Sequence, residues 1–176
     1  MWVKTGTLYS GRMELRDKLV VRRAVRADLA DVGRLGASLL RVHYDFDNDR
    51  FMRPTGDAAE GYAWFLGSQL KNTDALVLVG ERDGRIVGYL YAGIEPRNWK
   101  ELREEAGFVH DILVDDAARG QGAGAALMAA ALEWMRERGV PRVVLWTAAN
   151  NTRARQLFER LGFRPTMTEM TKELSG

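Results

Sequence analysis

The 176-residue chain carries 26 Lys and Arg against 24 Asp and Glu, a formal net charge of +2, and 46% of its residues are hydrophobic. This length and hydrophobic fraction predict one folded domain and argue against disorder. The charges are interleaved without a long basic run, so we expect no nucleic-acid partner. Cysteine is absent, which excludes disulfides, thiolate nucleophiles and cysteine-based zinc sites.

The first 18 residues show neither the apolar core of a signal peptide nor a clear hydrophobic period. We therefore expect a poorly ordered N-terminal extension over residues 1–18, followed by a single domain over residues 19–176. No apolar run approaches the roughly 20 residues that span a bilayer. The sequence thus favours a cytoplasmic protein with no membrane partner.

The elements expected along the domain are short strands and amphipathic helices. β-rich runs predict strands at 19–25, 107–114, 142–148 and 163–174, and a hairpin at 75–95 around an Asp-Gly turn. Apolar residues at three- and four-residue steps predict helices at 27–44, with Asp28 as a cap, and at 57–72, 123–138 and 151–162. Three consecutive strands favour antiparallel pairing, whereas the strand-helix-strand crossover near residue 120 favours a parallel pair. The expected fold is α/β: a mixed, mostly antiparallel central sheet flanked by helices on both faces.

A glycine-rich hexapeptide, Arg-Gly-Gln-Gly-Ala-Gly at 119–124, joins the strand at 107–114 to the next helix. A glycine turn from strand to helix usually presents amides to phosphate. The Gly-Lys-Ser/Thr of a Walker A loop is missing. A dinucleotide fingerprint matches on Gly120, Gly122 and Ala125, but the following strand lacks the acidic end that this site needs. Two interpretations of the loop remain. Either backbone amides and Arg119 hold a pyrophosphate there, or the loop is a turn with a purely structural role.

Two linked motifs indicate a family. The hexapeptide matches R/Q-x-x-G-x-G/A, and the later segment 151–163 matches N-x-x-A-x-x-L-Y-x-x-x-G-F except that Phe158 replaces the tyrosine. With both motifs in order, the sequence over about residues 19–173 resembles the GNAT superfamily of acetyl-CoA-dependent N-acetyltransferases. The resemblance implies acetyl-CoA as co-substrate and a parallel strand pair that splays apart. It assigns the coenzyme to Ile112, Leu113, Val114, Arg119, Gly120, Gln121, Gly122, Ala123, Gly124, Ala125, Asn151, Ala154 and Phe158.

The implied reaction is direct transfer of acetyl to a primary amine, which must lose a proton before it attacks. His110 is our candidate general base, and the alternative is a histidine that only packs or bonds locally. Asp111 matches an acidic residue frequent in the family, either catalytic or structural. Strict strand alternation puts His110 and Ile112 on one face and Asp111 on the other. A backbone N–H of Ile112, Leu113 or Val114 is expected to stabilise the oxyanion.

Phe158 departs from the family pattern, because many members carry there the tyrosine that protonates the leaving thiolate. A coenzyme thiol has a pKa of roughly 8.5 by analogy with cysteine, so its thiolate can leave unaided or take a proton from water. The departure puts the general acid in doubt and leaves the reaction intact. It also motivates a rival from another class, a non-catalytic acyl-CoA-binding or sensing domain. A dinucleotide-binding protein is a third hypothesis.

The acceptor site is expected at the acidic loop 44–51, where Tyr44, Asp45 and Asp47 could attract a cationic amine. Trp99 is a further candidate wall, and an ordinary solvated loop is the alternative. The loop lacks the Gly and distal Glu of a calcium loop, so we expect no metal. A small-molecule amine is the favoured acceptor, a protein N-terminus or lysine is the alternative, and the resemblance leaves a homodimer open.

Overall fold

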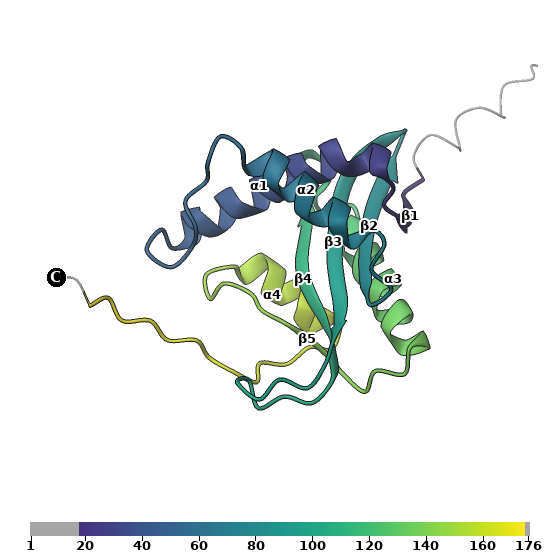
Figure 1. Cartoon of the computed structure of the whole chain (residues 1–176). Coiled ribbons are helices and arrows are strands. Elements are labelled where there is room, and N and C mark those ends of the chain that lie inside the picture. The colour runs from purple at the N-terminus through teal and green to yellow at the C-terminus, as the bar shows by residue number, and fades with distance from the viewer. Residues whose placement is uncertain (1–17, 175–176) are drawn as a thin grey trace, which may run out of the picture.

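The computed structural model describes residues 18–174 (Figure 1). Five strands form one sheet: β1 (Val20–Arg23), β2 (Ala75–Arg82), β3 (Arg85–Glu95), β4 (Ala106–Val114) and β5 (Val143–Leu145). The α-helices are α1 (Leu29–Phe46), α2 (Ala58–Gln69), α3 (Ala123–Glu137) and α4 (Thr152–Arg160), and two 3-10 turns lie at Arg26–Asp28 and Asp116–Ala118. The extension expected over residues 1–18 lies outside the described residues except for its last residue, so the predicted domain boundary stays a prediction.

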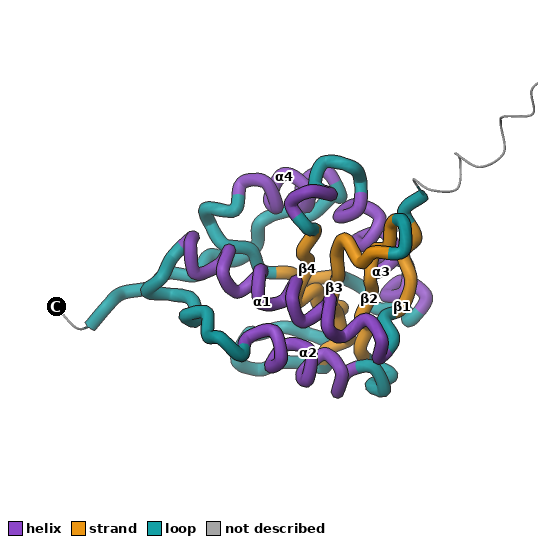
Figure 2. The backbone as a smooth tube through the Cα atoms, turned by 90° about the horizontal axis from the view of Figure 1, so that it is seen from above, coloured by secondary structure: helices purple, strands orange, loops and turns teal. Residues whose placement is uncertain are grey.

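The strands stand in chain order, β1 to β5. Neighbouring strands are antiparallel except β4 and β5, which are parallel because α3 carries the chain back across the sheet. Helices α1 and α2 cover one face, and α3 and α4 lie on the other (Figure 2). The expected fold class, a mixed and mostly antiparallel sheet between helices, is confirmed.

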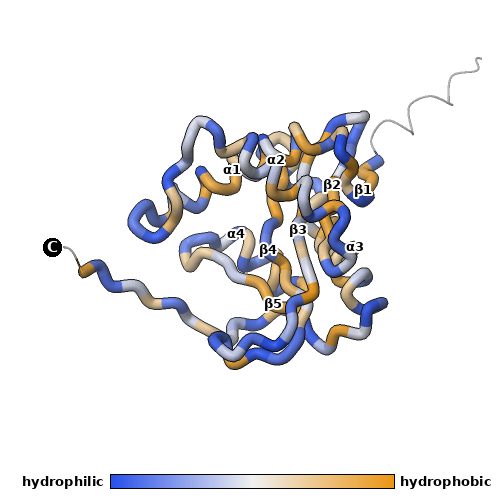
Figure 3. The backbone as a smooth tube through the Cα atoms, viewed as in Figure 1, coloured by the Kyte–Doolittle hydropathy of each residue, from blue (hydrophilic) through white to orange (hydrophobic). Residues whose placement is uncertain are grey.

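Two apolar layers hold the helices to the sheet, and β2 shows how its sequence serves both. Leu76 and Leu78 pack toward α3, whereas Val77 and Val79 pack toward α1 and α2. Each fully buried side chain of this size contributes roughly 1.5–3 kcal/mol. Hydrophobic residues accordingly concentrate in the strands, and the loop between α1 and α2 is hydrophilic (Figure 3). The sheet is thus a stiff platform for the groups at its β4–β5 end.

The cap expected at Asp28 takes a different form. Its carboxylate accepts no hydrogen bond from an amide of α1. It accepts hydrogen bonds from the Val25 amide at 2.8 Å and from both terminal nitrogens of Arg22 at 2.7 and 2.9 Å. The side chain is buried, and an ion pair of this kind outweighs a single cap. This cluster fixes β1 to the start of α1.

The prediction of a final strand at 163–174 is wrong. This segment forms no ladder with any described strand and runs away from the body toward the C-terminus (Figure 1). Its apolar residues Met167, Met170 and Leu174 are exposed, and its Glu169 pairs with Arg50 of the loop after α1 at 3.0 Å. The spacing of apolar residues suited a strand, but a strand also needs a neighbour to complete its hydrogen bonds.

Candidate active site

The parallel strands β4 and β5 part after three residue pairs. The last pair joins Val109 to Leu145, so β4 continues from His110 to Val114 without a β5 partner. The Asp115 amide donates to the Val87 carbonyl of the β3 side at 2.8 Å, and backbone direction alternates along a strand. The backbone groups of Ile112 and Val114 therefore point to the open edge, and those of Leu113 point to β3.

The glycine loop lies at one end of this open edge. Gly120 and Gly122 have φ values of +78° and +85°, and a side chain on either would meet no protein atom within 4 Å. Positive φ, rather than crowding, is what requires glycine at both positions. The first hydrogen bond of α3 runs from the Ala126 amide to the Gly122 carbonyl at 3.0 Å. The amides of residues 123–125 precede that bond and have no partner within the helix, which is the arrangement that suits an anion at a helix start.

Two arginines flank the loop. Arg119 donates from Nε to the Val114 carbonyl at 3.0 Å and pairs with Asp116. Arg82, at the end of β2, pairs with the side chain of Gln121 and approaches its carbonyl at 3.4 Å. Sequence reasoning missed Arg82, because 39 residues separate it from Gln121 and no motif connects them. Both guanidinium groups are close enough to the loop to favour an anion there.

The second motif positions the start of α4. Asn151 is its N-cap, and the side-chain oxygen accepts from the Ala154 amide at 3.1 Å. The Cβ that Gly124 lacks would lie 3.3 Å from Leu157, so glycine lets α3 and α4 approach closely. Phe158 is 6% exposed and packs in the core on the α3 side. Its place agrees with a packing role.

A β-bulge changes the faces expected for β4. Tyr91 pairs with Asp111 and Ala92 with Val109, so His110 is the extra residue between them. Its ring stacks on Tyr91, which packs against the α1 and α2 layer. Asp111 also faces that layer, whereas Ile112 packs toward α3. The strict alternation that separated His110 from Asp111 is therefore wrong, and the bulge brings both onto one face.

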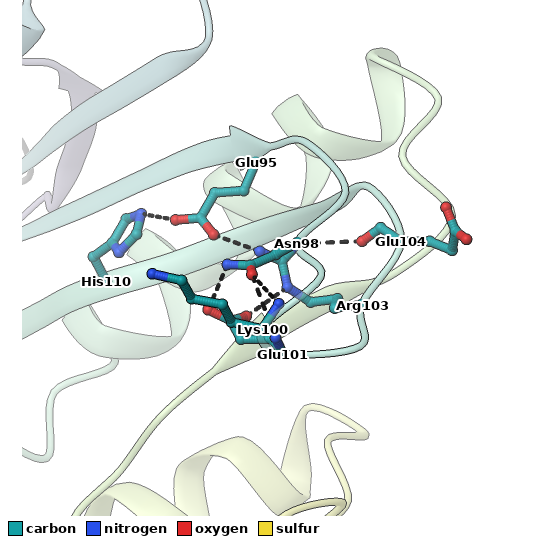
Figure 4. A network of polar contacts seen from close by, with 7 residues as sticks. All are labelled: Glu95, Asn98, Lys100, Glu101, Arg103, Glu104 and His110. Atoms are coloured by element: carbon teal, nitrogen blue, oxygen red, sulfur yellow. Dashed lines mark hydrogen bonds and ion pairs between the residues drawn. The ribbon is translucent and has the colours of Figure 1, made fainter.

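His110 lies between two aromatic rings, with Tyr91 and Phe108 stacked at 4.8 Å on either side. Its Nε2 lies 3.2 Å from a carboxylate oxygen of Glu95 at the end of β3 (Figure 4). Burial lowers the pKa of His110, the Glu95 charge raises it, and the Arg103 charge lowers it. Burial is the largest of these effects, so the pKa of His110 lies below its usual value, and the side chain remains 30% exposed and accessible.

Asp111 accepts a hydrogen bond from the buried Tyr89 hydroxyl at 3.1 Å. Burial raises the pKa of Asp111, although the bond from Tyr89 and the nearby His43 lower it. Burial, and then the Asp111 charge, also raise the pKa of Tyr62 to about 12. The sheet face under α1 therefore holds a protected polar group beside His110.

The acceptor candidates are divided between two loops. Tyr44, Asp45 and Asp47 line a shallow depression of about 510 Å³ at the end of α1. The Asp47 carboxylate already accepts from the amides of Asp49 and Arg50, at 3.2 and 3.1 Å. Trp99, 77% exposed, lies in the loop after β3, and no hydrogen bond or ring contact between described residues joins it to the other three.

No group of three metal-ligating side chains within residues 18–174 is arranged to hold a metal ion. None of the helices in that range is both long and apolar enough to cross a bilayer. Backbone amides and the guanidiniums of Arg119 and Arg82 lie at the glycine-loop end of the open edge, and the His110 imidazole with the carboxylates of Glu95 and Asp111 lies at the other. They suit a coenzyme phosphate at one end and proton transfer at the other.

The fold is an α/β fold in which a glycine-rich loop follows a strand that parts from its parallel neighbour. The acetyltransferase (GNAT) family model matches residues 39–163, and the chain therefore belongs to the GNAT acetyltransferase family. This membership removes the dinucleotide-binding hypothesis. The family assignment agrees with the enzyme class expected from the two motifs.

Curated relatives share about a third of their aligned residues with this chain. An uncharacterized N-acetyltransferase of Archaeoglobus fulgidus is 32% identical over 140 residues, covering 78% of this chain and 88% of that protein. A mycothiol acetyltransferase of Cellulomonas flavigena is 34% identical over 116 residues, covering 64% of this chain but only 31% of that protein. The chain thus matches less than a third of the longer relative.

A solved structure of the aminoglycoside N-acetyltransferase AAC(6')-Iy in complex with CoA has the same fold. Its TM-score is 0.69 at 17% identity, and the match covers 91% of this chain and 97% of that one. At this identity the likeness supports the fold alone.

Proposed function

We propose that the protein transfers acetyl from acetyl-CoA to a primary amine while both reactants are bound. The observation that carries this proposal is the open edge of β4, which leads from the glycine loop to His110. The residue steps from Val114 to His110 span about 13 Å at about 3.3 Å each. A coenzyme arm paired with Ile112 and Val114 would place its pyrophosphate on the loop and its thioester beside His110.

We assign the general base to His110. An amine is mostly protonated at neutral pH, and only its free form attacks. His110 takes the proton, the nitrogen attacks the thioester carbonyl carbon, and the carbonyl electrons move to oxygen. A backbone N–H of Ile112 or Val114 stabilises this oxyanion, because both residues face the open edge. Leu113, also a candidate from the sequence, has its backbone turned to β3.

Collapse of the oxyanion breaks the carbon–sulfur bond, the nitrogen releases its second proton to water, and the coenzyme leaves as a thiolate. Phe158 has no proton to give, so the thiolate takes one from water or from protonated His110. The balance is ammonium plus acetyl-CoA to amide, free thiol and one released proton. We keep Asp111 as a group that shapes the site, since its partner is a buried tyrosine.

A small-molecule amine is the proposed acceptor. The names of relatives and fold neighbours support it, because they refer to mycothiol and to aminoglycosides. The exposed carboxylate of Asp45, at the end of α1, would attract a cationic molecule into the depression. A protein amine remains the alternative acceptor, and a homodimer remains open.

Release of free thiol from acetyl-CoA across a panel of amines, with a no-amine control, tests the proposal. The panel includes short peptides with a free N-terminus or a single lysine. Amine-dependent release is the expected result, and its strongest member identifies the acceptor class. Saturable acetyl-CoA binding without release for any amine would favour the sensing domain. Absence of acetyl-CoA binding would overturn the coenzyme site itself.

A further inference from the structure

Glu95 divides its two oxygens between two partners (Figure 4). Oε1 lies 3.2 Å from Nε2 of His110, and Oε2 accepts from Nη2 of Arg103 at 2.6 Å. The three residues belong to β3, β4 and the loop between them. They form one chain of charge-assisted contacts from the loop to the imidazole.

Arg103 is held firmly. Its side chain is 9% exposed, its Nε donates to Glu101 at 2.9 Å, and its Nη1 donates to the Glu104 carbonyl at 3.2 Å. Two backbone hydrogen bonds with Asn98, at 2.8 and 3.0 Å, close the loop around it. Each edge of the guanidinium therefore has its own acceptor, and the carboxylate of Glu95 is fixed by a partner that cannot easily move.

The imidazole is restrained as well. Tyr91 and Phe108 stack on its two sides with interplanar angles of 22° and 21°, which fixes the ring plane. Within that plane, Nε2 faces the Glu95 carboxylate, with Oε1 at 3.2 Å. An ionised carboxylate only accepts hydrogen bonds, so this contact favours the tautomer of neutral His110 that carries its proton on Nε2. Nδ1 is then the lone pair left for a substrate proton.

We infer that Glu95 is the positioning residue that makes Nδ1 of His110 the proton-accepting atom, and that Arg103 holds Glu95 in that role. This inference rests on the proposed function of His110 as base. Second partners of this kind fix the tautomer and orientation of functional histidines elsewhere. Other polar groups near the ring are Tyr91, and Asp111, which is turned to Tyr89.

The test substitutes Glu95→Gln, with Glu104→Gln as the matched control. The Glu104 carboxylate lies in the same loop and pairs with Arg97, and only its backbone carbonyl, which the substitution keeps, contacts Arg103. Histidine labelled with ¹⁵N reports directly, since the sequence contains only two histidines and His43→Gln assigns the second. The protein is prepared without a polyhistidine tag, because a tag would add histidine signals. This readout needs no acceptor amine, so it stands apart from turnover.

The wild type is expected to carry the proton on Nε2 at high pH. Glu95→Gln should mix the tautomers, lower the pKa of His110 by removing a negative neighbour, and reduce kcat about tenfold while KM for acetyl-CoA holds. Glu104→Gln should change none of these. A proton on Nδ1 in the wild type, or an unchanged tautomer and pKa in Glu95→Gln, would overturn the inference. The expected tautomer in an enzyme that keeps its turnover after His110→Ala would instead overturn the proposed base.

Discussion

The two ends of the open β4 edge differ in the groups that form them: backbone groups at one end and side chains at the other. The coenzyme end consists of backbone groups on nearly consecutive residues, from the glycine loop at 119–124 to the first turn of α3. The other end, which we call the acceptor end because we propose that the amine loses its proton there, consists of side chains brought together across the sheet. Examples are His110 with Glu95 and Asp111 with Tyr89. A backbone site depends on local φ values, whereas a side-chain site depends on strand register. Substitutions should therefore affect the two ends in different ways.

The largest effect is expected at the acceptor end, from His110→Ala. Loss of a general base costs roughly 10²- to 10⁴-fold in rate, and acetyl-CoA affinity should hold because the glycine loop is untouched. The rate of the variant should follow only the deprotonation of the amine itself. Steady-state kinetics across pH, with isothermal titration for the coenzyme, measure both quantities.

His43→Gln is the control for that experiment, because His43 binds the Leu39 carbonyl of its own helix. The His43→Gln variant should keep the fall in rate at acid pH that protonation of His110 causes in the wild type. An identical profile for wild type and His110→Ala would contradict the assignment of His110.

At the coenzyme end, Gly122→Val should weaken acetyl-CoA binding by about tenfold or more. The φ of +85° costs a β-branched residue at least ~1 kcal/mol, and the side chain would occupy the open space where we expect the pyrophosphate. Gly139→Val is a matched control, since Gly139 has φ of +73° and equally open surroundings beyond the end of α3. Calorimetric titration should find weakened binding only in the first variant. Equal affinity in both would count against the loop as the phosphate site.

Arg82→Met should sharpen the comparison with a smaller effect. Arg82 orients Gln121 in the glycine loop, and losing one such contact at about 1 kcal/mol weakens acetyl-CoA binding about fivefold. Arg85→Met, on the same hairpin, should leave affinity unchanged because no hydrogen bond links that side chain to a described residue of the loop. Titration at two salt concentrations measures both variants. An unaltered affinity in Arg82→Met would remove this arginine from the coenzyme site.

The smallest effect is expected from Asp111→Asn, and it depends on pH. Because burial raises the folded-state pKa of Asp111, its stability contribution is complete below the unfolded pKa and is lost as pH rises through the folded value. Asparagine escapes that loss, so Asp111→Asn should raise Tm by a few degrees near pH 8 and not near pH 4. Thermal melts at both pH values measure the difference.

Tyr89→Phe provides the opposite change. It removes the hydrogen bond that lowers the pKa of Asp111, so it should reduce stability most at high pH. A gain in Tm at pH 4 for Asp111→Asn, or a large fall in its kcat, would show that Asp111 does more than shape the site.

The sequence predicted the strand, glycine loop and helix start of the proposed coenzyme end, because these elements lie in adjacent residues. Glycines at alternate positions, a strand before them and a helix after them were all visible. The sequence revealed the candidate residues of the acceptor end but not how they are arranged. Nothing in the run Phe-Val-His-Asp-Ile reveals that His110 is a bulge residue, since the bulge exists only relative to Tyr91 and Ala92 of β3. Register of this kind is a property of two strands together.

The same limit explains the other misses. Glu95 contacts Arg103 only because the loop after β3 turns back on itself. Arg82 contacts Gln121 only because the β2–β3 hairpin ends beside the glycine loop. The segment 163–174 had the apolar spacing of a strand, and spacing says nothing about whether a free ladder is available. Local sequence patterns therefore predicted most helices and strands, whereas the side-chain contacts of the site depend on how distant segments pair.

The single extra residue at His110 has a consequence for how this protein can change over generations. Deleting the residue before His110 would restore regular pairing of β4 with β3, place His110 opposite Ala92 and turn the imidazole to the α3 side, away from Glu95. The glycine loop, which begins nine residues further along, would keep its sequence. The loss of one codon would thus displace the base that we propose and leave intact the loop that we propose for the coenzyme.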